Sequence, residues 1–349
     1  MIQTMDYQPL VLVETAGLSR DEWLEYRRKG IGGSDASAVL GISPFLTTRD
    51  LFYDKRGIVS PESDENWIAK AVGTLLEPLV AEIFARKTGL KVFQRKVMYQ
   101  HPHHPWMLAD LDYLVEMPDG TLAILECKTT SNNASSKWWY NGEEIVPINY
   151  ESQGRHYMAV MNLSRVYFCC YVVGSGDEAI IRRIDRDMAY EQELIALESD
   201  FWHENVLANI PPPYTEDGDL IMESLRRSLG PADEDAPPVA ISDTQFTKVE
   251  RYLQLQAEKS QLMAEVNRLE AEMKRLKALI AVDMGKSCKA TYEDADNSYS
   301  ITMNPSRRPV VLSEVLPRMK ENHPEAYAEY VTISESRRLY GKKTARSAA

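Results

Sequence analysis

The sequence predicts an α/β fold in which a mixed central sheet is flanked by helices, with a helical module appended at the C-terminal end. Helical and strand-like segments alternate between residues 19 and 205, and a turn signal at Pro118–Gly120 joins two of the strands. An acidic, proline-rich stretch then separates these elements from the last third of the chain. Alternating elements favour a sheet covered by helices, and a hairpin within it makes the sheet mixed rather than wholly parallel.

Capping residues and apolar periodicity predict the helices. One helix begins at Ser19, with Glu22 at capping-box spacing, and Gly30 ends it. A second begins at Ser34, which follows two glycines. Two longer helices are expected over residues 67–90, where Gly73 and Pro78 interrupt the pattern, and over residues 150–163.

Strand-like segments alternate with these helices at residues 91–100, 107–117, 122–130, 165–173 and 179–184. The second and third pair as antiparallel neighbours across the Pro118–Gly120 turn. Side chains alternate between the two faces of a strand, so Glu126 and Lys128 lie on one face. An aliphatic strand therefore ends by bringing a carboxylate and an ammonium to one place.

A domain boundary is predicted over residues 211–243. This segment holds eight acidic and two basic residues, together with PPP and PADEDAPP. Low apolar content, prolines and like charge are typical of a solvated linker. We therefore expect a main domain over residues 1–210 and an accessory module over residues 244–349.

The accessory module begins with a heptad pattern over residues 247–284. Its apolar residues recur mostly at steps of three and four, and Lys259 occupies the one position of the repeat that is not apolar. The apolar residues are Leu255, Leu262, Val266, Leu269, Met273, Leu276 and Ile280. Such a repeat indicates a coiled-coil arm or a helical hairpin, and we expect a homo-oligomer. From Cys288 onward the pattern alternates as in a β-hairpin, and a short helical piece and a basic tail, RRLYGKKTAR, follow.

Composition argues against several classes of protein. No apolar run approaches the roughly 18 residues of a membrane span, and the N-terminus has no leader-like pattern, so we expect a soluble, cytoplasmic protein without a membrane partner. The four cysteines form no CxxC pair, which argues against zinc, iron–sulfur and disulfide frameworks. A net charge of −12 argues mildly against a nucleic-acid partner, although residues 211–243 alone contribute 8 − 2 = 6 of the excess negative charges.

Asp112, Glu126 and Lys128 are the strongest candidates for a catalytic centre. Neighbouring strands bring side chains within about 5 Å, so the hairpin can gather all three residues around one point. Two carboxylates suit Mg²⁺ or Mn²⁺, and a metal ion with a neighbouring lysine suits the hydrolysis of a phosphodiester by an activated water. Asp110 shares a strand face with Asp112 and is the alternative ligand.

Ordered motifs strengthen this interpretation. RRKGIGGSDASAVLG, GTLLEPLVAEIF, LADLDYLV, LECKT and YESQGRHYMAV occur in sequence between residues 20 and 205. In order and spacing they resemble the PD-(D/E)xK nuclease superfamily, and within it the group of the lambda exonuclease and the YqaJ-like viral recombinases. The resemblance implies a restriction-endonuclease-like core and a phage-encoded or bacterial Mg²⁺-dependent DNA nuclease. It also implies 5′-to-3′ digestion of double-stranded DNA ends for a single-strand annealing partner in recombination.

The resemblance also assigns roles to residues. The metal ligands it implies are Glu77, Asp112, Glu126 and the backbone carbonyl of Cys127. Lys128 becomes the catalytic lysine, and Gln153 matches a glutamine near the active site. Arg28 and Ser34 match positions that contact the 5′-terminal phosphate.

Residue chemistry offers an alternative for each of these further assignments. Glu77 stands in an apolar stretch, where an unpaired carboxylate is costly unless a cation is present; otherwise it is an exposed helix residue. Arg28 is a bidentate phosphate donor and Ser34 lies at a predicted helix start, but ordinary helix capping explains that segment equally. Asp35 is expected to be a cap rather than a phosphate contact. Gln153 otherwise belongs to a solvated helix face.

Two further motifs contain aromatic or imidazole side chains. Trp138 and Trp139 can stack on bases or separate the end of a duplex, whereas adjacent tryptophans elsewhere anchor a core. HPHHP at residues 101–105 lacks the spacing of a tetrahedral metal site and receives no catalytic role. A structure-specific or non-specific endonuclease, a hydrolase of small phosphate esters and a non-catalytic DNA-binding or assembly protein stay open as alternatives.

Overall fold

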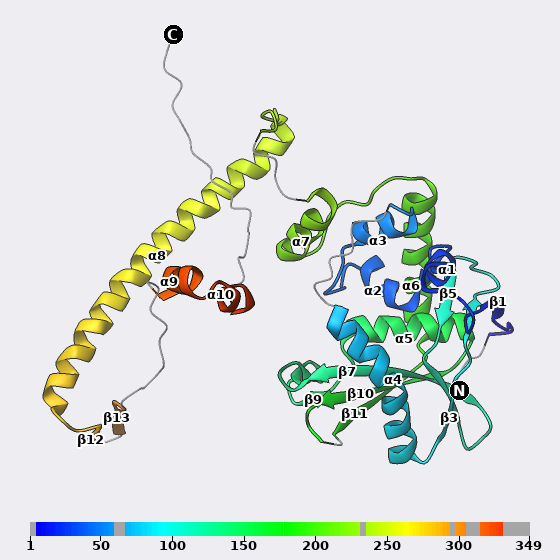
Figure 1. Ribbon diagram of the computed structural model, residues 1–349, viewed down its shortest axis with the longest axis horizontal. Helices are drawn as coiled ribbons and strands as arrows, with labels where there is room; N and C mark the ends of the chain where they lie inside the picture. Colours follow the sequence, from blue (N-terminus) through cyan, green and yellow to red (C-terminus); the bar gives the residue numbers. More distant parts are fainter. Residues whose placement is uncertain are drawn as a thin grey trace, which may run out of the picture. The chain divides into compact units, whose positions relative to one another are not determined.

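The computed structural model describes residues 5–58, 67–176, 178–230, 235–293, 297–304 and 315–330. The chain divides into two compact units, Met1–Pro231 and Ala232–Ala349 (Figure 1). The first is a mixed α/β unit, and the second consists of helices and one strand pair. Within the described ranges every helix is too short or too polar to cross a membrane.

The first helices are fixed by their caps. α1 (Arg20–Arg27) has the predicted capping box, because the Ser19 hydroxyl accepts from the backbone of Glu22 and the Glu22 carboxylate accepts from the backbone of Ser19. The sequence predicts that the second helix begins at Ser34, but α2 spans Gly33–Val39. Gly32, in the short strand β2 (Ile31–Gly32), precedes the helix, and its N–H donates to Asp35 Oδ2 at 2.9 Å. Gly32 is therefore the N-cap residue, and Asp35, at the third helical position, supplies the capping carboxylate.

α4 (Trp67–Thr88) runs without a break through Gly73 and Pro78, where the sequence indicates an interruption. Proline removes one helical hydrogen bond, but the following turns bury Val80, Ala81 and Phe84 against the sheet. This apolar burial stabilises the continuous helix. Gly89, with a φ of +71°, follows its end.

A five-stranded sheet forms the centre of the first unit, in the order β11-β10-β7-β6-β3. β7 (Leu122–Ser131) pairs in parallel with β10 (Arg165–Val173) and antiparallel with β6 (Tyr113–Glu116). β11 (Ala179–Asp185) and β3 (Lys91–Phe93) are the antiparallel edges. The prediction of a mixed sheet with a hairpin in its middle is confirmed.

A second, four-stranded sheet has the order β1-β4-β5-β2. Its other strands are β1 (Leu10–Glu14), β4 (Val97–Gln100) and β5 (Met107–Asp110). Each of the long strands predicted over residues 91–100 and 107–117 is thus divided between two sheets. The second predicted strand is interrupted at Leu111 and Asp112, between β5 and β6. There the side chain of Asp112 accepts the Cys127 N–H of β7.

Helices cover both faces of the five-stranded sheet (Figure 1). α5 (Ile148–Met161) packs over the face that carries Ile124 and Phe168, and α4 packs over the face that carries Leu125 and Cys169. The rest of the unit comprises α3 (Thr48–Lys55), the 3₁₀ helix η2 (Asn132–Trp138), the strand pair β8 (Trp139–Tyr140) and β9 (Glu143–Glu144), α6 (Met188–Asp200) and η3 (Phe201–Leu207). This arrangement leaves the carboxyl end of β7 between α4 and α5.

The predicted linker is partly folded. α7 (Gly218–Leu229) lies inside residues 211–243, and its Ser224 is fully buried. Ser224 Oγ donates to Asp50 Oδ1 at 2.7 Å, and Arg227 Nη2 lies 3.0 Å from Asp50 Oδ2. The first half of the acidic segment therefore belongs to the first unit, because its polar side chains satisfy a carboxylate of α3.

The second unit contains α8 (Asp243–Met284), β12 (Lys289–Glu293), β13 (Ser298–Thr302), α9 (Val315–Asn322) and α10 (Pro324–Tyr330). The predicted long helix and the antiparallel hairpin are present. All the apolar heptad positions from Leu255 to Ile280 are exposed. The basic tail falls outside the described residues.

Candidate active site

The charged residues at the end of β7 form one hydrogen-bonded cluster with α5. Lys128 Nζ lies 2.9 Å from Glu126 Oε2 and 3.0 Å from Gln153 Oε1. Gln153 Nε2 donates to the same Glu126 oxygen at 2.8 Å. Glu126 is 1% exposed, and its other oxygen, Oε1, is buried without a hydrogen-bond partner. Strand alternation and α5 packing thus bring three of the predicted residues together.

Asp112 lies beside Glu126 because of the hairpin register. Tyr113 opposes Leu125 in the β6–β7 ladder, so Asp112 and Glu126 each stand one residue beyond that pair. The Cys127 N–H donates to Asp112 Oδ2 at 2.8 Å, which fixes the carboxylate at the sheet edge. Burial raises the pKa of Asp112, and burial together with the Asp112 charge raises the pKa of Glu126 to about 8.

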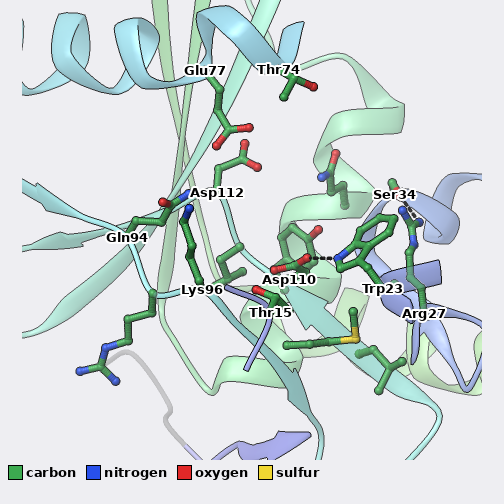
Figure 2. A pocket seen from close by; sticks show the side chains of 18 residues that line it. Thr15, Trp23, Arg27, Ser34, Thr74, Glu77, Gln94, Lys96, Asp110 and Asp112 are labelled. Carbon is green, nitrogen blue, oxygen red and sulfur yellow. Dashed lines mark hydrogen bonds between the residues drawn. The ribbon is translucent and has the colours of Figure 1, made fainter. Parts of the chain in front are cut away.

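Glu77 reaches the same place from α4. Burial and the charges of Asp112 and Asp110 raise its pKa to about 7. Figure 2 shows the carboxylates of Glu77 and Asp112 facing each other at one end of a cavity of about 510 Å³. Raised pKa values at three neighbouring carboxyl groups mark a site in which their ionised forms repel one another.

The donors of this site fit a divalent cation. Glu77, Asp112 and the unpartnered Oε1 of Glu126 offer the hard oxygens that Mg²⁺ prefers, and Mg²⁺ retains several waters, so few protein ligands suffice. Among the described residues, no group of three or more His, Cys, Asp or Glu side chains is arranged so that it could hold a metal ion. The fit therefore rests on donor chemistry, on the unpartnered buried oxygen and on the relief of repulsion between carboxylates. The Cys127 carbonyl lies between Glu126 and Lys128 in β7.

Lys128 is a permanent cation in this site. Burial acts to lower its pKa, but the charges of Glu126 and Asp112 outweigh burial and hold the pKa above its ordinary value. A lysine that keeps its proton cannot act as a general base. It holds Glu126 through the hydrogen bond from Nζ to Oε2 and presents a positive charge to any anion at this site.

Asp110 has a different environment from Asp112. The Trp23 indole Nε1 donates to Asp110 Oδ2 at 2.7 Å, a contact drawn in Figure 2. Burial raises the pKa of Asp110 despite that hydrogen bond and the nearby charge of Arg27. Of the two aspartates, only Asp112 contacts β7 beside Glu126.

The structure brings Ser34 together with Arg27 and not with Arg28. Arg27 Nη2 donates to Ser34 Oγ, and both residues line the cavity that holds Glu77 and Asp112 (Figure 2). Arg28 follows the last residue of α1 and pairs with Asp54 through Nε at 3.4 Å. Adjacent residues of a helix point in directions about 100° apart, so only one of the two arginines can enter the cavity.

The two tryptophans differ in exposure. Trp138 is 2% exposed and packs against Tyr150, with ring centroids 5.7 Å apart, which favours the alternative interpretation of this residue as a core anchor. Trp139 is 41% exposed, and Arg182 Cζ lies 5.1 Å from its ring centroid. Only Trp139 is available to a base.

Several lining residues were missed by the sequence analysis. Trp23, Arg27, Thr74, Gln94 and Lys96 all line the cavity. Trp23 and Arg27 lie four residues apart on α1, and this helical spacing is a signal that could have identified them. Lys96, whose charge lowers the pKa of Glu77, could not be found, because residues 91–100 read as one continuous strand.

Comparisons with known proteins agree with the motif pattern. Residues 22–164 match the family model described as the YqaJ-like viral recombinase domain. The predicted resemblance to the YqaJ-like viral recombinases is thereby confirmed.

The chain is also similar to a bacterial protein along most of its length. It is 29% identical over 332 residues to the uncharacterized protein YqaJ of Bacillus subtilis (strain 168), covering 94% of this chain and 96% of that protein.

Two solved structures are more distantly similar. An alkaline exonuclease (LHK-Exo) from Laribacter hongkongensis is 21% identical, with 54% of this chain and 94% of that chain covered and a TM-score of 0.45. A phage related exonuclease from Haemophilus somnus 129PT is 11% identical, with coverages of 52% and 96% and a TM-score of 0.38.

Proposed function

We propose that this protein is a Mg²⁺-dependent DNA nuclease that digests double-stranded DNA from 5′ ends and thereby supplies single strands for recombination. The observation that carries the proposal is the convergence of Glu77, Asp112 and Glu126 beside the permanently charged Lys128. The YqaJ-like viral recombinase domain supports the role in recombination. A PD-(D/E)xK arrangement of these residues is part of the proposal.

Bound Mg²⁺, or Mn²⁺ in its place, supplies an acidified water and neutralises charge on the phosphate. The remaining chemistry belongs to the protein. The Lys128 ammonium stabilises the negative charge that grows on the attacked phosphate. Gln153, on α5, donates to Oε2 of Glu126 and so holds the carboxylate in place. The other oxygen, Oε1, receives no hydrogen bond from the protein.

Arg27 and Ser34 support recognition of a 5′ end. They line the same cavity as Glu77 and Asp112, so a terminal phosphate held at one end leaves the neighbouring phosphodiester near the carboxylates. An arginine fork is a suitable donor set for a phosphate. Arg28, outside this cavity, is not part of the proposed phosphate site. Trp139 remains a proposed surface for a displaced base.

Partners follow from the proposed reaction and from the second unit. A single strand left by 5′ digestion is the substrate of a single-strand annealing protein, which we propose as a partner. The exposed apolar heptads of α8 support self-association of the chain, because water disfavours a continuous apolar stripe and a second such helix covers it.

The test is digestion of a linear duplex labelled on one strand, with and without a 5′ phosphate, beside a covalently closed circle in Mg²⁺. Loss of the 5′-phosphorylated strand with an intact circle supports the proposal. Nicking of the circle would make the protein an endonuclease with the same centre. No cleavage of either substrate would favour a non-catalytic DNA-binding protein.

A further inference from the structure

A buried charge cluster lies behind Arg27 and Ser34. Asp35, in the first turn of α2, accepts from Arg27 Nη2 at 2.6 Å through Oδ1 and from Lys55 Nζ at 2.7 Å through Oδ2. Lys55 is the last residue of α3, and its side chain is 0% exposed. The same ammonium donates to the backbone carbonyl of Arg27 at 3.2 Å. Lys55 therefore contacts both the side chain that holds Arg27 and the backbone of Arg27 itself.

Burying a lysine has a large desolvation cost, which this cluster offsets with hydrogen bonds and with an ionised partner. Burial acts to raise the pKa of Asp35, but the charges of Arg27 and Lys55 outweigh burial and hold that pKa below its ordinary value. The carboxylate is therefore ionised whenever the protein is folded at neutral pH. Both carboxylate oxygens accept hydrogen bonds: Oδ1 from Arg27, and Oδ2 from Lys55 and from the Gly32 N–H.

The charges of the cluster do not cancel. Arg27 and Lys55 share the single carboxylate of Asp35, while Asp54 lies 3.4 Å from Arg28 and 3.8 Å from Lys55. The five side chains together carry three positive and two negative charges. Without Lys55, Arg27 and Asp35 would form a neutral pair. Asp110, which lines the same cavity and interacts with the charge of Arg27, balances the remaining positive charge. The contribution of Lys55 is therefore a second buried partner that holds the Asp35 carboxylate in place.

The position of Arg27 is also constrained from the solvent side. Its Cζ lies 5.2 Å from the centroid of the Trp23 ring, and its Nη2 reaches Ser34 Oγ. The Arg27 side chain is 27% exposed, in contrast to the fully buried Lys55. Arg27 can therefore meet a ligand in the cavity, whereas Lys55 cannot.

We propose that Lys55 and Asp35 are positioning residues for the recognition of a terminal phosphate. They fix the Arg27 guanidinium against Ser34 at that end of the cavity. This inference rests on the proposed function, because the ligand is the 5′ phosphate of a DNA strand. Neither residue touches the substrate. The buried side chains of Lys55 and Asp35 instead strengthen the preference for 5′-phosphorylated over 5′-hydroxyl ends by holding Arg27 in position.

The experiment measures the affinity of the full chain for two duplexes that differ only in a 5′ phosphate, by fluorescence anisotropy in Ca²⁺ so that turnover does not intervene. Lys55→Met should reduce the ratio of the two affinities by about tenfold, and Arg27→Met should reduce it at least as far. Lys91→Met removes a lysine from an exposed ion pair with Glu116 and is the matched control, whose ratio should equal that of the unaltered protein.

The ratio separates positioning from general damage, because a merely structural defect weakens both duplexes equally. If Lys55→Met alone does not fold, the double variant Lys55→Met with Asp35→Asn removes both buried charges, and its ratio should also fall because Arg27 loses its tether. A folded variant that keeps the full preference overturns the inference. An unaltered protein that cleaves DNA without any preference overturns the inference but not the nuclease, and one that neither binds nor cleaves DNA overturns both.

Discussion

The ammonium of Lys128 lies 2.9 Å from one oxygen of Glu126, while the other oxygen of that buried carboxylate has no partner. One oxygen is thus held by the protein and the other is left for a ligand. This division of a single carboxylate links Lys128 to the proposed role of Glu126 as a metal ligand, so the two residues are expected to act as a unit.

The Lys128→Ala variant tests this relationship. Loss of the ammonium removes charge stabilisation at the phosphate, and kcat should fall by about 10²- to 10³-fold while binding of duplex DNA persists. Lys137→Ala, at an exposed lysine nearby, should leave kcat unchanged. Circular dichroism would establish that both variants are folded. Full activity in a folded Lys128→Ala protein would place the catalytic centre elsewhere.

Metal binding should stabilise the protein more at high pH than at low pH. Glu77 and Glu126 have pKa values raised to about 7 and about 8 from an ordinary 4.5. The folded protein therefore binds their protons more tightly than the unfolded chain does, and the metal-free protein loses stability as pH rises through this range. A cation bound to the ionised groups offsets that loss, so the increase in Tm caused by Mg²⁺ should be larger at about pH 8.5 than at about pH 6. Equal shifts at both values would mean that Mg²⁺ binds elsewhere.

Neutralising Glu77 should have opposite effects with and without metal. In Glu77→Gln the repulsion from Asp112 and Asp110 is gone, so the Tm in EDTA at pH above 7 should rise. The further increase in Tm on adding Mg²⁺ should shrink, because one oxygen donor has lost its charge. Differential scanning fluorimetry measures both quantities. Glu82→Gln, on the same helix in an exposed ion pair with Arg86, is the control that should change neither.

The central part of the site was predictable because it depends on local geometry. Glu126 and Lys128 share a face through the two-residue period of a strand, and Asp112 is their neighbour through a hairpin whose turn is visible in the sequence. No long-range contact is needed to bring these three residues together.

The periphery of the site was not predictable, because it depends on tertiary contacts. Whether Arg27 or Arg28 meets Ser34 is decided by the rotation of α1 over the sheet, and the partner of Asp35 comes from α3, twenty residues further along. Which of Trp138 and Trp139 is buried also depends on tertiary packing, because one of two adjacent side chains faces the core and the other faces solvent. The first half of the acidic segment folds because Ser224 bonds to Asp50 of α3. Asp50 lies far away in the sequence, so the composition of residues 211–243 gives no sign of this contact.

Gly33→Ala should destabilise the first unit through packing. A Cβ atom at residue 33 would lie 2.4 Å from the Tyr157 ring, which is buried between α2 and α5. Either the ring or α2 must move, and overpacking of this kind costs about 1–3 kcal/mol. Gly17→Ala, where a Cβ meets nothing within 4 Å, is the matched control and should keep the original free energy of unfolding. Urea denaturation followed by fluorescence compares the two variants, and equal midpoints would mean that α2 and α5 pack less closely than described.

Self-association should depend on the apolar stripe of α8. Leu262 and Leu269 are 64% and 48% exposed and lie seven residues apart, on one face of the helix. Replacing both with lysine puts charges into the interface of any coiled coil that this face forms, so sedimentation velocity should show a smaller species. Arg268→Lys and Lys274→Arg, which conserve charge outside the stripe, should leave the sedimentation coefficient unchanged. Because the substitutions lie in the second unit, cleavage of a short duplex by the first unit should continue. An unaltered sedimentation coefficient in the double leucine variant would assign any association to the first unit instead.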